Sequence, residues 1–255
     1  MAAAAEHDFS RAARILAAAR ELVLKRGVKG LTIAEIAQRA HVGKGTAYLY
    51  WDTKEDLVFE LFARDFLAGV EQEIDTLTAD PDLARPRRLC PRLVHTALDR
   101  PFVRALQTGD ADLLGVLTHH PRSRELLDML GPAALTETVL PVWRRNRLAR
   151  TDWPLEEQGY VLHALVIGFL EVATRAQVLP GVTVDDPDQV MAAAVTALLG
   201  PEEASPTQVR AAAAEGRQLL RERRETLLTL ITTNHKANQR QQSEQVQQVK
   251  RVEEM

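Results

Sequence analysis

The short stretch from Lys44 to Tyr50 carries side chains suited to contact with a nucleic acid. Lys44 can pair with a phosphate or a guanine, and Thr46 offers a hydroxyl group to a phosphate or a methyl group to thymine. The phenol groups of Tyr48 and Tyr50 can bond to phosphates, and Gly45 leaves room for a close approach. The alternative is that both tyrosines are core aromatics of a small helical bundle. We favour contact with DNA for both residues.

The residues before this stretch predict the local structure that would position it. Thr32 and Glu35 have the spacing of a capping box, and Ile33 and Ile36 give the following helix an apolar face. Gly43 then opens a turn, so the basic and tyrosine-bearing segment becomes the second helix of a helix–turn–helix unit. Such a second helix docks in the major groove of DNA. Thr32 itself either faces a phosphate or acts only as a cap.

This stretch resembles the DNA-binding segment of TetR-family transcriptional repressors. It departs from the family at His41, Gly43 and Leu49, where Gly, Ser and His are usual. The resemblance also implies a phosphate contact from Lys54, which would offset the unfavourable position of a cation in the first turn of a helix. The predicted DNA-contacting residues are therefore Thr32, Lys44, Gly45, Thr46, Tyr48, Tyr50 and Lys54. The matching residues are Thr32-Ile33-Ala34-Glu35-Ile36-Ala37, Val42, Lys44-Gly45-Thr46, Tyr48, Tyr50-Trp51 and Lys54-Glu55-Asp56-Leu57.

The composition is that of a soluble protein with a sizeable core. The chain has 255 residues, of which 45% are hydrophobic and 26% charged, and its net charge is -3. That charge argues against a protein that coats DNA uniformly, but a sequence reader needs only a local basic face. The single cysteine, Cys90, excludes an intramolecular disulfide and suits a reducing cytoplasm, where we expect the protein to be located. Neither a signal peptide nor an apolar run of membrane-spanning length is present.

The abundance of Ala, Leu and Arg, without long strand-like alternation, predicts an all-α fold in three parts. Residues 1–55 form the DNA-binding domain, 56–200 a regulatory and dimerisation domain, and 201–255 a helical extension with a polar tail. A first helix begins near Phe9 or Ser10, and Lys54 to about Leu77 is one long helix. Further helices are expected over 87–99, 102–108, 110–118, 123–130, 133–148, 155–178, 187–199 and 208–231. The tail after Thr232 is too polar to form a core of its own, and its role stays open.

Two of these helices carry the predicted dimer interface. The family resemblance implies that the last two helices of the regulatory domain pair with their copies in a partner subunit. On these helices the predicted interface residues are Leu162, Val166, Phe169, Ala173, Ala193 and Ala197. The alternative is an ordinary intramolecular core. A small reading head needs two copies to recognise enough base pairs, which favours the dimer.

A cavity for a small effector is predicted in the regulatory domain. Polar side chains on an apolar helix need partners or a ligand, and His163, Ile167 and Glu171 recur there at helical spacing. His95, Gln107 and Trp143 are expected to converge on the same cavity. Each of these residues has the alternative role of a satisfied structural or interface residue. The neighbouring pair His119-His120 is expected in an exposed turn, without a metal.

Together these features predict a homodimeric repressor that binds a palindromic operator and is released by a small, mostly apolar effector. The resemblance also implies that the long helix from Lys54 links the effector to the DNA-binding head. Nothing in the sequence supports an enzyme or a resident cofactor, since there is no nucleophile motif, glycine-rich phosphate loop or metal-ligand set. The alternative is a helical adaptor whose C-terminal extension binds a protein partner. Membrane association is not expected.

Overall fold

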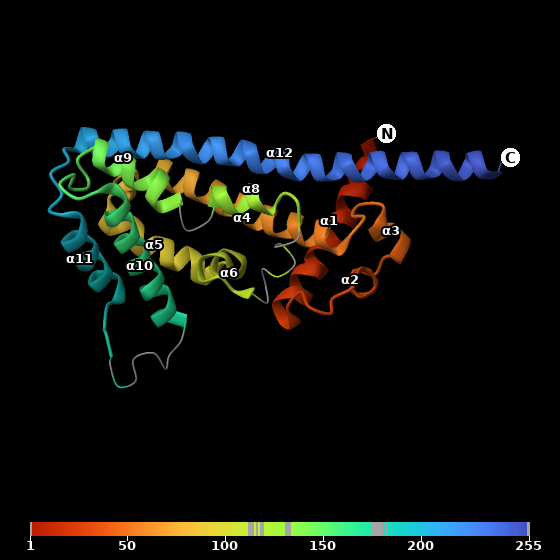
Figure 1. Cartoon of the computed structure of the whole chain (residues 1–255), viewed down its shortest axis with the longest axis horizontal. Helices are drawn as coiled ribbons and strands as arrows, with labels where there is room; N and C mark the ends of the chain where they lie inside the picture. The colour runs from red at the N-terminus through yellow and green to blue at the C-terminus, as the bar shows by residue number, and fades with distance from the viewer. Residues whose placement is uncertain are drawn as a thin grey trace. The chain divides into compact units, whose positions relative to one another are not determined.

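The computed structural model is all-helical over the part of the chain that it describes (Figure 1). The described backbone comprises residues 2–111, 115, 117, 120–130, 134–174, 181 and 183–253, and the side chains of 2–10, 106–108, 127–130 and 233–253 are not described. The elements are α1 (Ala2–Arg26), α2 (Ile33–Arg39), α3 (Lys44–Tyr48), α4 (Lys54–Ala79), η1 (Pro81–Ala84), α5 (Pro86–Asp99), α6 (Pro101–Thr108), α8 (Ser123–Leu130), η3 (Leu135–Val139), α9 (Leu140–Arg145), α10 (Leu155–Thr174), α11 (Pro187–Leu199) and α12 (Pro206–Glu253).

The described residues group into two compact units that are not continuous in sequence. The head unit contains the described residues of 2–64, 111–123 and 226–253, and the body unit contains those of 65–110 and 124–225. Helices α4 and α12 each contribute to both units. The domain boundaries expected from the sequence lie at residues 55 and 200. They differ from this division into units, which does not test them, so they remain predictions.

Local capping sets the helices of the head unit. Helix α1 begins at Ala2, earlier than the sequence suggested, and ends at Arg26. The next residue, Gly27, has a φ of 73°, which glycine adopts readily. The capping box at the start of α2 is present: the Thr32 hydroxyl accepts from the Glu35 backbone N–H, and the Glu35 carboxylate accepts from that of Thr32. Helix α3 starts at Lys44, and its N-cap residue, Gly43, provides no side-chain hydrogen bond.

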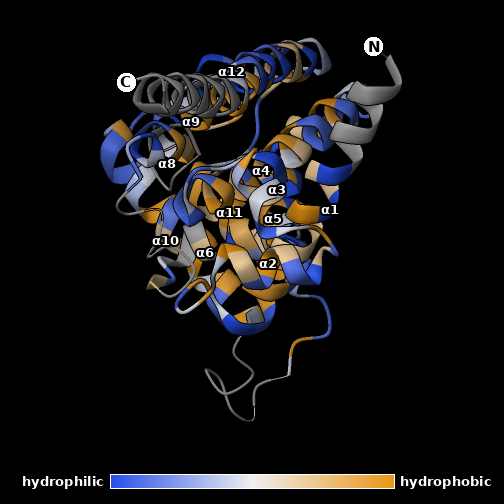
Figure 2. Cartoon of the chain, turned by 90° about the vertical axis from the view of Figure 1, so that its right-hand side faces the viewer, coloured by the Kyte–Doolittle hydropathy of each residue, from blue (hydrophilic) through white to orange (hydrophobic). Residues whose placement is uncertain are grey.

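Most of the large apolar residues of these helices, coloured orange in Figure 2, are buried. Helix α2 packs against both α1 and α3, which fixes the helix–turn–helix geometry. The apolar stripe of α4 is buried from Leu57 through Phe62 to Val70. The fully buried side chains of the head unit include Ile15, Ala19, Val23, Val28, Ile36, Ala47, Trp51, Leu57 and Phe59.

The body unit packs α5, α6, η3, α9, α10 and α11 around one hydrophobic core. The helix predicted over 133–148 is wrong in its form, because Leu135–Val139 is a π-helical turn and the following α-helix ends at Arg145. Pro141 follows the π-helical turn and lies in the first turn of α9, within helical backbone that runs without a break from 134 to 145. Helix α10 is described to Thr174, and α11 and α8 have the predicted bounds.

The C-terminal extension is one helix of 48 residues, α12. It begins with Pro206 in its first turn, and the Ser205 hydroxyl accepts a hydrogen bond from the Gln208 backbone N–H. Its first half buries Val209, Ala212 and Ala213 in the core of the body unit. The sequence predicted a helix to Ile231, and the helical backbone continues to Glu253.

Candidate functional site

Helix α3 presents polar and aromatic side chains to solvent. Of its residues only Ala47 is buried, where it anchors the helix to the head unit. Tyr48 is 39% exposed and the following Leu49 is 60% exposed, so neither serves as a core residue. The Lys44 ammonium group lies 5.7 Å from the centre of the Tyr48 ring, which places both on the same face. This arrangement gives an accessible surface with a cation and a phenol side by side.

The other predicted DNA-contacting residues surround this helix. Gly45 is exposed, Thr46 is half-buried, and Thr32 is exposed at the start of α2. Tyr50 is half-buried and lies against Trp51, with 5.5 Å between ring centres. Lys54, the first residue of α4, is half-buried. All of these residues belong to the head unit.

A buried polar network fixes the end of α3 to helix α4. Glu60 is completely buried, and its carboxylate accepts hydrogen bonds from the indole N–H of Trp51 at 2.8 Å and from the Arg64 guanidinium at 2.7 Å. A buried carboxylate is tolerated only when it is bonded in this way. The network therefore specifies where the chain leaves α3 and how it enters α4.

His120 forms a second attachment within the head unit. The sequence predicted an exposed turn at positions 119 and 120; His119 lies outside the described residues, and for His120 the prediction is wrong. Its ring is buried and stacks on Phe59, with 4.2 Å between ring centres. Nδ1 accepts from the Arg122 backbone N–H, so Nε2 carries the proton and donates to the Asp56 carboxylate at 3.3 Å.

Asp56 also connects this contact to the first turn of α4. Its carboxylate accepts from the Thr53 hydroxyl at 2.6 Å and from the Thr53 backbone N–H at 3.1 Å. Partial burial opposes ionisation of Asp56, but the hydrogen bonds from His120 and Thr53 outweigh it, so the pKa of this carboxyl is lowered. Helix α4 thus begins at a negatively charged group held from two segments of the chain.

The body unit contains an apolar cavity of about 190 Å³. Its walls come from α4, α5, α6, η3, α10 and α12, which are far apart in the sequence. Phe66, Val70, Leu93, Val94, Ala97, Val103, Leu135, Val139, Val166, Ile167, Leu170 and Leu220 supply the apolar lining. The polar side chains in its wall are Glu73, Thr96, His163 and Arg223.

Three of these four polar groups are satisfied or neutral. The Glu73 carboxylate accepts two hydrogen bonds from the Arg92 guanidinium, at 2.7 and 3.2 Å, and the Thr96 hydroxyl also donates to it. Burial lowers the pKa of His163 below its usual value of 6.5, which keeps the ring neutral near pH 7. Arg223 differs from these, because its guanidinium donates to the Thr138 hydroxyl at 3.0 Å but pairs with no acid in the described part of the chain.

Of the six residues predicted to line an effector cavity, His163 and Ile167 do so. His95 is exposed and lies 2.9 Å from the Asp188 carboxylate. Glu171 is half-buried outside the cavity wall, and the side chain of Gln107 lies outside the described residues. Sequence periodicity on α10 located one wall correctly, whereas Arg223 was missed because nothing in its local sequence distinguishes it from the neighbouring arginines.

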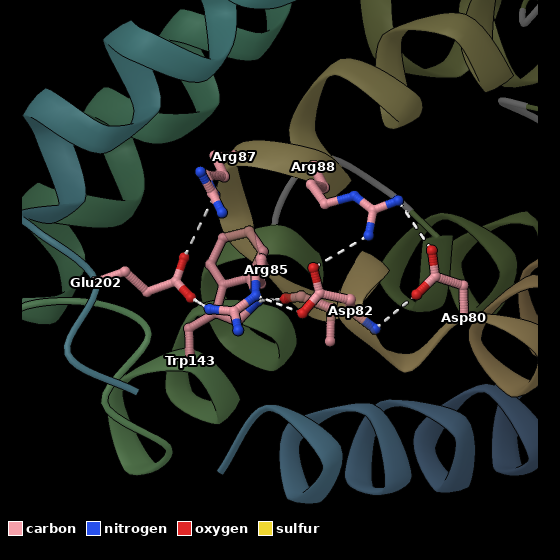
Figure 3. Close-up of polar contacts among 8 residues, drawn as sticks. Asp80, Asp82, Arg85, Arg87, Arg88, Trp143 and Glu202 are labelled. Carbon is pink, nitrogen blue, oxygen red and sulfur yellow. Dashed lines mark hydrogen bonds and ion pairs between the residues drawn. The ribbon is translucent and has the colours of Figure 1, made fainter. Parts of the chain in front are cut away.

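Trp143 belongs to the core and not to the cavity. Its indole N–H donates to the carbonyl of Ala84 at 2.8 Å, and the ring is buried. Figure 3 shows it beside a chain of ion pairs in which Arg85 bridges Asp82 and Glu202. These contacts attach the segment before α5 to the segment before α12, and so have a structural role.

The predicted dimer residues divide into an inner and an outer group. Leu162 is completely buried in the core of the body unit, Phe169 packs against that core, and Val166 lines the cavity, so these three face the chain's own interior. Ala173, Ala193 and Ala197 are exposed. The exposed apolar stripe of α10 instead contains Tyr160, Val161, Ala164, Gly168 and Val172, and that of α11 contains Val190, Ala193 and Ala197. The two helices pack side by side (Figure 1).

The described residues form neither a metal-binding cluster nor a membrane-spanning helix. No group of three or more His, Cys, Asp or Glu side chains there is arranged to hold a metal ion. Within the same residues, no helix combines the length and apolarity needed to span a membrane.

The comparisons with known proteins concern both parts of the chain. Residues 15–61 match the family described as "Bacterial regulatory proteins, tetR family". That match runs from the middle of α1 into α4 and includes all of α2 and α3. The fatty acid metabolism regulator protein of Bacillus subtilis (strain 168) is 26% identical over 181 residues, which are 62% of this chain and 91% of the relative.

Two solved structures are similar over most of their length. The structure of RolR in complex with resorcinol shares 24% identity and a TM-score of 0.42, covering 85% of this chain and 95% of the other. The structure of Thermus thermophilus FadR, a TetR-family repressor in complex with lauroyl-CoA, shares 28% identity and a TM-score of 0.37. It covers 74% of this chain and 92% of the other.

Proposed function

We propose that this chain is a TetR-family transcriptional regulator, and that it represses transcription as a homodimer on a palindromic operator until a small, mostly apolar effector occupies its body cavity. The observation that carries the DNA-binding part is the exposure of α3. A five-residue helix with one buried alanine and an exposed Lys44–Tyr48 pair has no role in packing that explains its composition. That composition fits contact with phosphates and base edges.

In this proposal the DNA contacts have distinct tasks. Tyr48, Tyr50 and Thr32 bond to phosphates and set the position of the head. Lys44 and Thr46 reach base edges near the start of α3, and Gly45 permits the close approach. Lys54 binds a phosphate at the start of α4.

The proposed dimer uses the exposed face of α10 and α11. Small side chains at Ala164, Gly168, Ala193 and Ala197 allow helices of a second copy to approach closely. Gly168 in particular has open space around its Cα within one subunit, so packing inside the chain does not explain it. Two subunits would place their α3 helices in successive major grooves, roughly 34–36 Å apart.

The proposed effector site is the cavity of the body unit. Helix α4 supplies Phe66, Val70 and Glu73 to its wall, and the same helix begins in the head unit at Lys54. An effector that shifts α4 therefore changes the position of the head. A typical coupling of about 1–3 kcal/mol would weaken operator binding several-fold to a hundredfold. The Bacillus subtilis relative is named a fatty acid metabolism regulator, which supports an effector with an aliphatic chain.

Fluorescence anisotropy on DNA fragments from around the protein's own gene tests the proposal. Moderate salt and a scrambled competitor separate sequence recognition from nonspecific attraction. We expect a competitor-resistant complex on a palindrome with two subunits per site. Binding that vanishes with modest salt and has no sequence preference would instead favour the adaptor role.

Two variants test the contacts themselves. Tyr48→Phe should weaken operator binding by roughly 5- to 30-fold, because each of two subunits loses one hydrogen bond. Lys54→Ala should reduce the slope of log operator affinity against log salt concentration by about one per subunit, because each subunit loses one phosphate contact. Arg210→Ala is the control, since it removes an exposed cation from helix α12 in the body unit, away from the proposed DNA contacts and dimer face. If neither head variant changes operator affinity, these contact assignments are incorrect.

A further inference from the structure

Arg223 is an unusual residue for the wall of an apolar cavity. It lies on α12, and it lines the cavity beside Leu220 of the same helix. Its only polar contact in the described part of the chain is the hydrogen bond to the Thr138 hydroxyl. A guanidinium has five N–H groups, so most of its donors are left for a further partner.

The charges around the cavity do not compensate Arg223. The carboxylate of Glu73 is already held by Arg92 through two hydrogen bonds. His163 is neutral near pH 7, because burial lowers its pKa. The next residue on α12, Arg224, pairs with Glu71 and does not line the cavity. When Glu73 is counted with its partner Arg92, Arg223 is the one charged side chain of the wall that has no partner of opposite charge among the described residues.

We propose that the effector is an amphiphilic carboxylate, whose hydrocarbon part fills the cavity and whose carboxylate binds Arg223. This inference rests on the proposed function, since it names the chemical class of the effector at the same site. The planar guanidinium can hold a carboxylate through two parallel hydrogen bonds, and the Thr138 hydroxyl fixes its orientation. A neutral hydrocarbon would leave the cation uncompensated.

Burial makes the need for a counter-ion stronger. The partly buried position lowers the pKa of Arg223, which shows that its surroundings disfavour the charged form. An arginine nevertheless remains protonated in proteins. An anion that enters the cavity therefore relieves an unfavourable charge and also gains hydrogen bonds.

The cavity size limits the hydrocarbon part. A cavity of 150 Å³ in another protein binds benzene, and this one measures about 190 Å³. A single aromatic ring or an aliphatic chain of about eight carbons is the size that fits. The extension also acquires a role, because α12 supplies the charged group that would recognise the effector.

Calorimetric titration of the full chain with sodium octanoate and with 1-octanol tests the proposal. The two probes have the same chain length and differ in the charge of the head group. We expect octanoate to bind at least tenfold more tightly than 1-octanol, since a hydrogen bond to a charged group changes affinity by about 10- to 100-fold.

Matched arginine variants locate the charge that matters. Arg223→Met should weaken octanoate by about 10- to 100-fold and leave 1-octanol nearly unchanged. Arg224→Met, a change of the neighbouring ion-paired arginine, should alter neither. Thr138→Val should weaken octanoate several-fold by removing the hydroxyl that orients Arg223. Circular dichroism of each variant confirms that the helices are intact.

Three results would overturn the inference. Equal weakening of both probes by Arg223→Met would mean that the residue only shapes the wall. Tighter binding of 1-octanol than of octanoate, or no binding of either, would exclude a carboxylate of this size. The operator titration of the unliganded protein is independent of all three. Octanoate binding that leaves operator affinity unchanged would preserve this inference and remove the regulatory role of the cavity.

Discussion

Gly159 of helix α10 occupies a position with no space for a side chain. A methyl carbon there would lie 2.1 Å from Thr136 Cγ2, 2.5 Å from its hydroxyl oxygen and 2.8 Å from its Cβ. Thr136 belongs to η3, the π-helical turn that packs against α10 and carries the cavity residues Leu135 and Val139. The substitution Gly159→Ala should therefore push η3 away from α10.

The expected cost follows from two opposing effects. Overpacking of a tight contact destabilises a protein by about 1–3 kcal/mol. Replacing glycine by alanine inside a helix returns about 0.5–1 kcal/mol. The central values leave a net loss of about 1 kcal/mol, which lowers the melting temperature of a chain of this size by roughly 2–4 °C.

Gly216→Ala is the matched control, because Gly216 also lies inside a helix of the body unit. A methyl carbon there would make an ordinary contact, 3.8 Å from Leu77 Cδ1. The Gly216→Ala variant should benefit from the higher helix propensity of alanine without a steric clash. Its melting temperature should therefore rise by about 1–4 °C. Thermal unfolding followed by circular dichroism measures both changes.

The opposite signs of the two substitutions are the test. A Gly159→Ala protein as stable as Gly216→Ala would refute the packing argument. Adding Thr136→Ala to Gly159→Ala should restore part of the loss, since it removes the two shortest contacts and leaves the one at 2.8 Å.

Three further outcomes are expected. The buried thiol of Cys90, whose pKa burial raises to about 12, should react with iodoacetamide at pH 8 only after unfolding in urea, and rapid labelling of the native protein would contradict its burial. Asp56→Asn should destabilise the head by about 1–2 kcal/mol at pH 7. Because the pKa of Asp56 is lowered in the folded state, its carboxylate stabilises the protein fully above the usual pKa of 3.8. This stabilisation is lost as the pH falls through the folded-state pKa. The difference between the urea midpoints of the wild-type and Asp56→Asn proteins should therefore shrink below about pH 4. Ala193→Glu should convert the proposed dimer to a monomer in sedimentation, whereas Ala211→Glu, an exposed position on α12, should not.

The sequence predicted those features that depend on a few neighbouring residues. The Thr32–Glu35 capping box, the uncapped start at Gly43 and the bounds of α11 follow from caps, prolines and apolar spacing within one or two helical turns.

Features made by distant segments were not predictable in this way. The residues that line the cavity extend in sequence from Phe66 to Arg223. Of the six residues predicted to line it, only His163 and Ile167, which helical periodicity identified on α10, do so. Leu162 shares helix α10 with the exposed Ala164 and Ala173 but faces the core, because tertiary packing decides which side of this apolar helix is covered. His120 needed Phe59 and Asp56 beside it, and neither is near it in sequence.

Helix α12 has a consequence for how the protein unfolds. Its Val209 and Ala213 are buried in the body unit, and its Leu227 and Ile231 are buried in the head unit. Helix α4 is likewise continuous between the two. Each unit buries part of α4 and part of α12. If one unit unfolded, both helices would lose buried residues, and the other unit would be destabilised. We therefore expect the two units to unfold cooperatively. We therefore expect one calorimetric transition, and truncation before Pro206 should abolish it by removing core residues of both units.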